Sequence, residues 1–327
     1  MKRIALVMTI LGLIYFNALS KILIVDNHVP TPSGAYATIQ LAHDAAATGD
    51  TLLLTPSEAQ YTGITLTKPV CITGNGWAKA SSQMPNTKTS GFIFNTGSAG
   101  SILTGCEIIG DVTINTGSIN IKRNRCNYIG VTQGTNVLII QNVIIYDRRD
   151  FSVNVAGGTV TLISNNIIIN NYYSNDYYGS GINILYPSTV IVSNNIVSGR
   201  STALSLNSSS TLTIKNNIVL AGGIGGLTSP FNNIGNSTQF PAIDGNIQNV
   251  DINLLFVDKA NNDFHLKAGS PAIGAGYGGT DCGVYGGELG FVDKGVPNLP
   301  YIYFLDVPEI ARKQEGLNIT VKAKSGN

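Results

Sequence analysis

Apolar runs that end in asparagine recur along the middle of this 327-residue chain. The five runs are 121–124 (IKRN), 139–142 (IIQN), 163–166 (ISNN), 192–195 (VSNN) and 214–217 (IKNN). In all but the first, Val or Ile follows the last asparagine. These asparagines are 18, 24, 29 and 22 residues apart. An irregular period of this size is typical of a solenoid whose surplus residues form outward loops.

A parallel coil explains why asparagine recurs at one place in each repeat. If each repeat is one turn, equivalent residues stack about 4.8 Å apart, and their amides can hydrogen-bond to one another and to the turn backbone. Asparagine also tolerates the left-handed backbone of a sharp corner. We therefore expect buried asparagines at one corner, with Gly105 and Asn75 at the same corner of earlier turns. The predicted ladder consists of Asn142, Asn166, Asn195 and Asn217. An antiparallel sandwich is the alternative, but it would not place asparagine so regularly.

Residues 38–47 (TIQLAHDAAA) predict the one short helix. Ile39 and Ala42 share a face with the alanines that follow, Thr38 can cap the start, and Gly49 can close the end. We expect this helix to cover the open end of the coil. From residue 52 to about 290 the pattern is short strands and turns, which excludes folds built from βαβ units.

The first 20 residues predict a secretory signal peptide. Lys2 and Arg3 precede an apolar run, and Ala18-Leu19-Ser20 is a small-x-small cleavage pattern. The run is short for a membrane span, and no longer one follows. We therefore expect a secreted protein (periplasmic, extracellular or at the cell surface) with no membrane span. The expected divisions are 1–20 signal peptide, 21–55 N-terminal segment with the capping helix, 56–290 β-helix, and 291–327 C-terminal tail with two short strands, 301–305 and 317–323.

Charge excludes some partners. The net charge is +1 for the whole chain, and residues 1–20 carry two positive charges, so the remainder carries 1 − 2 = −1. Such a chain has no electrostatic attraction for nucleic acid. Four cysteines are present, without metal-ligand spacing. We expect buried free thiols, with Cys106 and Cys126 as the pair that could form a disulfide.

Three blocks give the chain a resemblance to the secreted right-handed parallel β-helix proteins of the pectin-lyase-like superfamily, of the bacterial surface type. The first is 36–51 with 68–76 (KPVCITGNG), the second is the asparagine repeat, and the third is 256–276 with 281–286 (DCGVYG). The resemblance implies an all-β, single-stranded right-handed parallel β-helix with an N-terminal capping helix and a short C-terminal β tail. It implies no particular activity, because lyases, hydrolases, epimerases and inert adhesins share this fold.

A corner rich in tyrosine and charge follows the repeat asparagines. Counted from them, Asp147, Asn171 and Arg200 should stack on three successive turns, and insertions at 146–151 and 170–178 enlarge the corner. Tyrosine stacks on sugar rings and arginine can hold a uronate carboxylate, so we predict a surface for polysaccharide or cell-surface glycan. The alternative is a polar loop whose Asp and Arg pair with each other. The predicted binding residues are Asp147, Arg148, Arg149, Asp150, Tyr172, Tyr173, Asp176, Tyr177, Tyr178 and Arg200.

No catalytic residue is predicted. The residues expected to point outward on the strand after this corner include no acid or base: Ser152, Asn154, Asn183 and Ser205. His28 and His43 lie near the N-terminus, and His265 lies in the closing block. Whether the protein is an enzyme therefore stays open.

Three functional hypotheses remain. The first is a monomeric β-helix that binds polysaccharide without cleaving it, the second a polysaccharide lyase for uronate-containing glycans, and the third a glycoside hydrolase using paired Asp from Asp147, Asp150 and Asp176. No metal site or cofactor is predicted. Calcium at Asp258 with Asp263 is the alternative.

Overall fold

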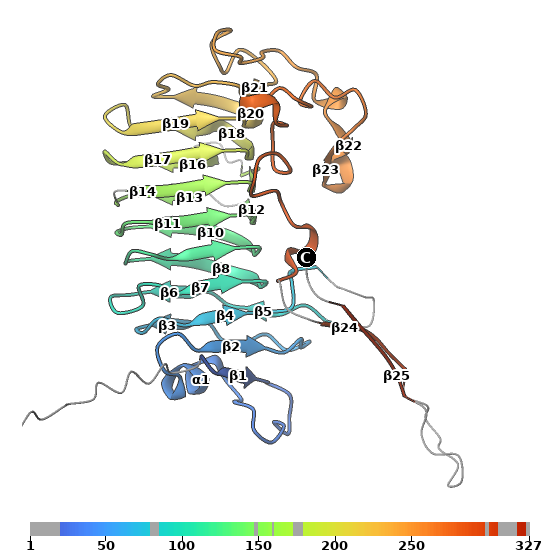
Figure 1. Ribbon diagram of the computed structural model, residues 1–327. Helices are drawn as coiled ribbons and strands as arrows, with labels where there is room; N and C mark the ends of the chain where they lie inside the picture. The colour runs from blue at the N-terminus through green and yellow to red at the C-terminus, as the bar shows by residue number, and fades with distance from the viewer. Residues whose placement is uncertain are drawn as a thin grey trace, which may run out of the picture.

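The computed structural model describes residues 20–78, 85–146, 150–158, 160–172, 179–297, 301–306 and 319–324. Within them, short strands wind into a coil whose turns stack as two long parallel sheets (Figure 1). The stack rises from β1 at the bottom of Figure 1 to β21 at the top. The expected all-β solenoid is confirmed.

Sheet A takes one strand from each of nine turns. In stacking order these are β1 (Ile22–Val25), β2 (Thr51–Leu54), β4 (Cys71–Thr73), β7 (Ile102–Thr104), β9 (Asn120–Lys122), β11 (Val137–Ile140), β14 (Val160–Ser164), β17 (Thr189–Ser193) and β19 (Thr211–Lys215). Ile121, Ile139, Ile163, Val192 and Ile214, which open the five repeats, pair in register and are fully buried. Stacked aliphatic side chains of this kind form the core of the coil.

Sheet B takes the rest of each turn and bends at the tyrosine-rich corner that follows the repeat asparagines. Its strands are β3 (Ile64–Leu66), β5 (Lys88–Thr89), β6 (Phe92–Phe94), β8 (Glu107–Ile114), β10 (Arg125–Val131), β12 (Val143–Tyr146), β13 (Phe151–Val155), β15 (Ile167–Asn170), β16 (Ser180–Ile184), β18 (Ile196–Ser205), β20 (Ile218–Gly225) and β21 (Ile234–Gly235). Where the corner carries an insertion, one turn contributes two strands: β12 with β13, and β15 with β16.

The asparagine ladder forms as predicted between sheet A and sheet B. Each ladder backbone N–H donates to the side-chain oxygen of the asparagine in the next turn, as in Asn142 to Asn166 at 2.9 Å and Asn166 to Asn195 at 3.0 Å. Asn142, Asn166, Asn195 and Asn217 are all 0% exposed. The ladder runs further than predicted, from Asn124 through Asn217 to Asn233 and Asn246. The last two were missed because their spacings are short.

The left-handed backbone lies one residue earlier than we expected. The residues that precede the first six ladder asparagines have φ between 53° and 58°, and Gly245, before Asn246, has φ 75°. The six are Arg123, Gln141, Asn165, Asn194, Asn216 and Asn232. Gly105 (φ 72°) also holds this earlier place, and Cys106 takes the ladder place, since its N–H donates to Asn124 Oδ1 at 3.0 Å. Asn75 aligns with Cys106 by the pairing of Thr73 with Thr104. Ladder asparagines are thus required for their side-chain hydrogen bonds rather than for their backbone angles.

Helix α1 (Ile39–Ala45) caps the bottom of the coil, as predicted. Thr38 accepts a hydrogen bond from the backbone N–H of Leu41 at 3.2 Å, and Ile39 and Ala42 are buried. The helix ends before residue 47, because the chain turns there around the Asp50 carboxylate, which accepts backbone N–H groups of Lys21 and Ala47 at 2.8 Å each.

Beyond Ile247, which bridges Ile234, the chain leaves the coil. It forms η1 (Ile252–Leu254), β22 (Phe256–Asp258), η2 (Lys259–Asn261) and β23 (Asp263–Leu266), of which β22 and β23 pair antiparallel. It then runs back down one side of the stack (Figure 1). We call residues 275–297, with η3 (Tyr277–Gly279) and η4 (Asp293–Gly295), the strap. Parallel pairing therefore ends well before residue 290, the limit we expected for the coil.

The strap is fastened by the left-handed residues, whose side chains point outward. From the top turn downward the hydrogen bonds are Asn232 Nδ2 to Ala275 O (3.1 Å), Tyr277 N to Asn216 Oδ1 (2.8 Å), Asn194 Nδ2 to Asp281 O (3.4 Å), Asn165 Nδ2 to Val284 O and Gly286 O (2.8 Å each), and Gln141 Nε2 to Leu289 O (3.0 Å). Arg123 donates to Val296 O at 3.4 Å. Consecutive turns thus bind consecutive parts of the strap.

The strap and the hairpin of β22 and β23 cover an apolar stripe on the outside of sheet B. The stripe consists of the residues directly after ladder asparagines, Val143, Ile167, Ile196 and Ile218. They form a second buried cluster with residues that include Phe256, Phe264, Cys282, Val284 and Phe291. This explains why Val or Ile follows each repeat except the first, where the corresponding residue, Arg125, is exposed.

The C-terminal tail contains the two expected strands, as an antiparallel hairpin of β24 (Tyr301–Asp306) and β25 (Thr320–Lys324) that Figure 1 draws projecting from the side of the coil. No helix in the described part of the chain is long and apolar enough to cross a membrane.

Candidate functional site

The register leads up to the predicted corner. Tyr146 pairs with Asn170 and Asn170 with Gly199, which places Asn171 and Arg200 directly after paired residues. Asn171 N donates to Tyr146 O at 3.2 Å, and Arg200 N donates to Gly179 O at 2.9 Å. Arg200 thus bonds to the chain after the second insertion, whereas Asn171 bonds to the strand before it, and the stack of Asp147, Asn171 and Arg200 stays a prediction.

Three predicted binding residues are described at this corner, and Asn170 connects two of them. Its buried side chain donates to Asp150 O at 3.2 Å and accepts the backbone N–H of Tyr172 at 3.0 Å. Asp150 and Arg200 are exposed and Tyr172 is half-buried. The remaining seven predicted residues lie outside the described parts of the chain: Asp147, Arg148, Arg149, Tyr173, Asp176, Tyr177 and Tyr178.

Tyr128 belongs to the same region, although we did not predict it as a site residue. Its ring lies 6.2 Å, centroid to centroid, from that of Tyr146. It also lies over Gly130, where any Cβ would come within 2.5 Å of the Tyr128 hydroxyl. Burial raises the pKa of Tyr128, a hydrogen bond to Asn154 lowers it, and the charges of Asp111 and Asp150 raise it further. The signal in the sequence was its place four residues after Asn124.

Beyond the corner, the outer surface of sheet B carries rows of uncharged polar groups. One row, in register across five turns, is Thr113, Gly130, Asn154, Asn183 and Ser205. Asn183 Nδ2 donates to Asn154 Oδ1 at 2.8 Å. The next row links Asn95, Asn115 and Thr132 through their side chains. We call these eight residues the amide face.

One residue expected on this face is not available. Ser152 is 0% exposed, and its hydroxyl lies 3.5 Å from the carbonyl of Ile169. Its neighbour in register on the preceding turn is Tyr128. Asn183 is only 4% exposed, whereas Asn154 and Ser205 are half-buried.

The amide face continues into an open groove in the earlier turns. This groove has a volume of about 360 Å³ and is lined by Gly63, Gly91 and Thr113, among others, with the exposed carboxylate of Asp111 at its edge. Glycine keeps it open, because a Cβ at Gly63 would come within 1.6 Å of Gly91 O. An extended ligand would therefore find a hollow, largely uncharged track along the stacking axis.

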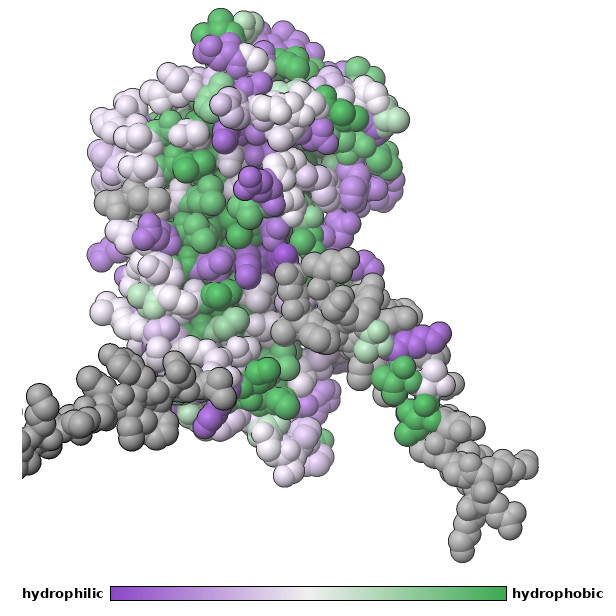
Figure 2. Space-filling model, viewed as in Figure 1, coloured by the Kyte–Doolittle hydropathy of each residue, from purple (hydrophilic) through white to green (hydrophobic). Residues whose placement is uncertain are grey.

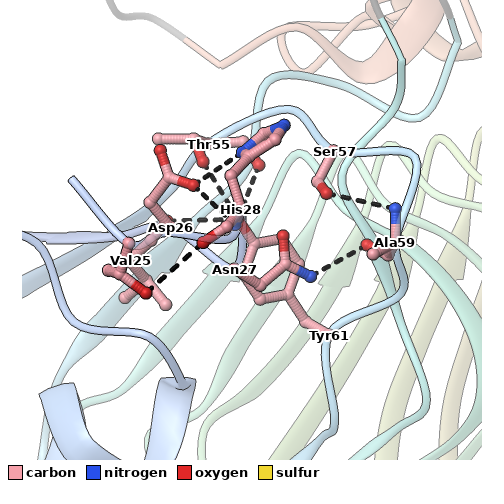
Figure 3. Close-up of polar contacts among 9 residues, drawn as sticks. Val25, Asp26, Asn27, His28, Thr55, Ser57, Ala59 and Tyr61 are labelled. Atoms are coloured by element: carbon pink, nitrogen blue, oxygen red, sulfur yellow. Dashed lines mark hydrogen bonds and ion pairs between the residues drawn. The ribbon is translucent and has the colours of Figure 1, made fainter.

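The histidines lie apart from this track. His28 contacts Asp26 at 2.6 Å near the bottom of the coil (Figure 3). Beside them, the buried Tyr61 hydroxyl donates to Thr55 O at 2.9 Å and Asn27 donates to Ala59 O at 3.0 Å. These bonds hold two loops to β1 and β2, which is a structural task.

His265 is part of a second acid–histidine cluster, between the hairpin and the strap. Its ring contacts Asp263 at 2.7 Å, lies 3.6 Å from Asp293, and stacks on Tyr285 at 4.1 Å. Tyr285 donates to Asp293 at 2.8 Å. These contacts join two covering segments of the fold.

The structure adds no support for calcium. Asp258 accepts the backbone N–H and the side-chain amide of Asn261, and Asp263 serves His265. In the described ranges no three His, Cys, Asp or Glu side chains come together as a metal site. All four cysteines are free, and burial raises the pKa of the Cys106 thiol to about 12.

Comparison with known proteins agrees with this architecture. A family model described as a right-handed beta helix region matches residues 112–248. Among solved structures, the chain is similar to pectate lyase Pel9A, with a TM-score of 0.51 and 14% sequence identity over 81% of this chain and 96% of that one. A search of curated proteins finds no match. At this identity the likeness shows the fold alone, which is a right-handed parallel β-helix.

Proposed function

We propose that this protein binds polysaccharide along the amide face, with Tyr128 and the corner residues Asp150, Tyr172 and Arg200 as one rim of the site. The row from Thr113 to Ser205 is the observation that carries the proposal. Side-chain amides both donate and accept hydrogen bonds, as sugar hydroxyls do. A row that repeats about every 4.8 Å suits a chain-like ligand better than a compact one.

Binding without cleavage is favoured by the chemistry of this face. The side chains of its seven residues other than Gly130 cannot act as acid or base at neutral pH. The aromatic rings at the rim supply apolar contact for pyranose rings. The same fold in pectate lyase Pel9A is consistent with a carbohydrate ligand.

Affinity electrophoresis tests the proposal. The native gels contain soluble starch, hydroxyethyl cellulose, xylan, galactan, alginate or polygalacturonate. We expect at least one polysaccharide to retard the protein, and Asn154→Ala and Arg200→Ala each to weaken that binding by roughly 5- to 10-fold, the equivalent of one hydrogen bond. The matched control is Asn120→Ala, which removes an outward, half-buried asparagine from sheet A. Retained binding in both variants would move the site elsewhere, and no retardation by any polysaccharide would refute it.

Glycoside hydrolysis is the second candidate, because Asp111 pairs with Tyr128 from one neighbouring turn and Asp150 directly precedes β13, which pairs with β10 from the other. Two carboxyl groups flanking a sugar are the machinery of such enzymes. The assay is release of reducing ends from the polysaccharide that binds. Loss of release in Asp111→Asn and in Asp150→Asn would establish hydrolysis, whereas binding without release leaves the first proposal.

We also propose that the protein is exported, on the pattern of residues 1–20. Expression with these residues in a secreting host should give a product whose N-terminus, read by mass spectrometry, is Lys21. An intact N-terminus on the exported protein would contradict cleavage at this site.

A further inference from the structure

The strap forms a second cleft, on a different face of the coil from the groove. Its floor is the outer surface of sheet A at strands β14, β17 and β19, and its wall is the strap. The cleft has a volume of about 390 Å³. Figure 2 shows hydrophobic residues gathered in a band down this side of the molecule. Because the strap is tied to each of these turns, the cleft is preformed.

An aromatic platform stands at one side of this cleft. The backbone N–H of Tyr277 donates to Asn216 Oδ1 and so fixes this residue to the coil, whereas its side chain stays exposed, at 62%. Its ring is held edge-on by Phe231, with centroids 5.7 Å apart, and Lys215 Nζ lies 5.4 Å from the ring centroid. Among the described residues Lys215 has no carboxylate within ion-pair distance.

The floor beside this platform combines aliphatic side chains with serine hydroxyl groups. Leu162 and Ile191 are half-buried there, and Ser164 and Ser193 lie in the same turns. Ser164 donates its hydroxyl proton to Asn165 Oδ1 at 2.6 Å, so the 3.0 Å bond between the two serines must use the Ser193 proton. The serine floor therefore offers acceptors and no donor.

The wall has the same bias toward acceptors. Thr280 donates its hydroxyl proton to Tyr277 O at 3.1 Å, which leaves its oxygen as an acceptor. Glu288 is exposed and contributes a carboxylate. Lys215 supplies the donor on this side. A ligand that complements the cleft needs several hydroxyl donors, one acceptor and an apolar face.

We propose that this cleft binds a single neutral pyranose unit, with its C–H face on Tyr277 and its hydroxyls donating to Glu288, Thr280 and Ser193. Lys215 donates to a ring or hydroxyl oxygen. A carboxylate-bearing sugar fits less well, since Glu288 would repel it. The site is independent of the proposed groove, because the two share no residue and lie on different sheets.

Saturation-transfer NMR with small probes tests the cleft by itself. The probes are the methyl glycosides of glucose, galactose and mannose, with sodium glucuronate as the acidic counterpart. We expect saturation transfer to at least one neutral glycoside, and roughly tenfold weaker binding in Tyr277→Ala. The control, Tyr186→Ala, removes an equally exposed tyrosine from a turn outside both sites. Because Tyr277→Ala could loosen the strap, Glu288→Gln and Lys215→Met serve as a second pair that keeps the bulk of each side chain.

Three results would refute sugar binding in the cleft. They are no saturation transfer to any neutral glycoside, wild-type affinity in Tyr277→Ala and in both variants of the second pair, or a response to glucuronate alone. These results can be told apart from failure of the proposed polysaccharide site on the amide face. Polysaccharide retardation with no response to the glycosides would refute the cleft and leave the groove, and the reverse result would refute the groove.

Discussion

The replacement Asn195→Leu tests the asparagine ladder at its centre. The Asn195 side chain donates to Ile163 O at 2.8 Å, to Ser193 O at 3.0 Å and to Asn217 Oδ1 at 3.0 Å. Its oxygen accepts the backbone N–H and the side chain of Asn166, both at 3.0 Å. Leucine has similar volume but makes none of these bonds.

Two groups carry most of the expected cost. The backbone N–H of Asn166 and the carbonyl of Ile163 are buried and would lose their partner in the next turn. Each buried polar group left unpaired costs about 1–3 kcal/mol, so the free energy of unfolding should fall by about 2–6 kcal/mol. Since a domain is stable by about 5–15 kcal/mol, this is a large fraction of the total.

Urea unfolding followed by circular dichroism measures this loss. The control is Asn207→Leu, which removes an asparagine whose two side-chain hydrogen bonds, to Leu185 O and from Ser209 N at 2.9 Å each, are both exposed. It should change stability by no more than about 0.5 kcal/mol. An Asn195→Leu midpoint equal to that of wild type, with an unchanged slope, would refute the reasoning, because the ladder would then be held by its aliphatic neighbours alone.

Other perturbations reach other parts of the fold. Deleting residues 21–49 uncovers the edge of β2, so size-exclusion chromatography should show oligomers or aggregate, and a folded monomer would contradict the role of α1. Backbone N–H groups of Lys21 and Ala47 lower the pKa of Asp50 against the opposing effect of burial. The stability due to this carboxylate is therefore present above its unfolded pKa of about 3.9 and is lost as pH falls through the lower folded pKa. The melting temperature of Asp50→Asn should therefore fall less on acidification than that of wild type. Replacing Asn165 by Ala frees Val284 O and Gly286 O, and limited proteolysis should then cut within residues 275–297 faster than in wild type, with equal cutting as the contrary result.

The sequence allowed the coil to be predicted because its signal is local and chemical. Each repeat asparagine, such as Asn166 or Asn195, lies between two strands, and this pattern recurs once per turn. The strap escaped prediction because residues 275–297 are rich in glycine and have no strand or helix period. One indication was present: Val143, Ile167, Ile196 and Ile218 are followed by further aliphatic residues, and strands that are apolar on both faces are covered on both.

The site was harder to predict than the fold for a physical reason. Register follows from counting, and the pairing of Tyr146 with Asn170 and of Asn170 with Gly199 agrees with the count. Exposure does not follow from counting alone, since alternation places Ser152 on the outside and the structure leaves it 0% exposed. Tyr128 was overlooked because its part in the site depends on Gly130, two residues later, leaving room for its ring.

Paired asparagines connect these features. In Asn165-Asn166 and Asn194-Asn195, the first residue adopts the left-handed backbone and points outward to the strap, whereas the second points inward to the ladder. One doublet thus joins coil to coil and coil to strap. The cleft depends on both kinds of bond, since the strap is its wall. The groove depends on the coil alone, because it lies on another face of each turn. Damage to the strap should therefore separate the two sites, which is the arrangement expected of two binding functions on one scaffold.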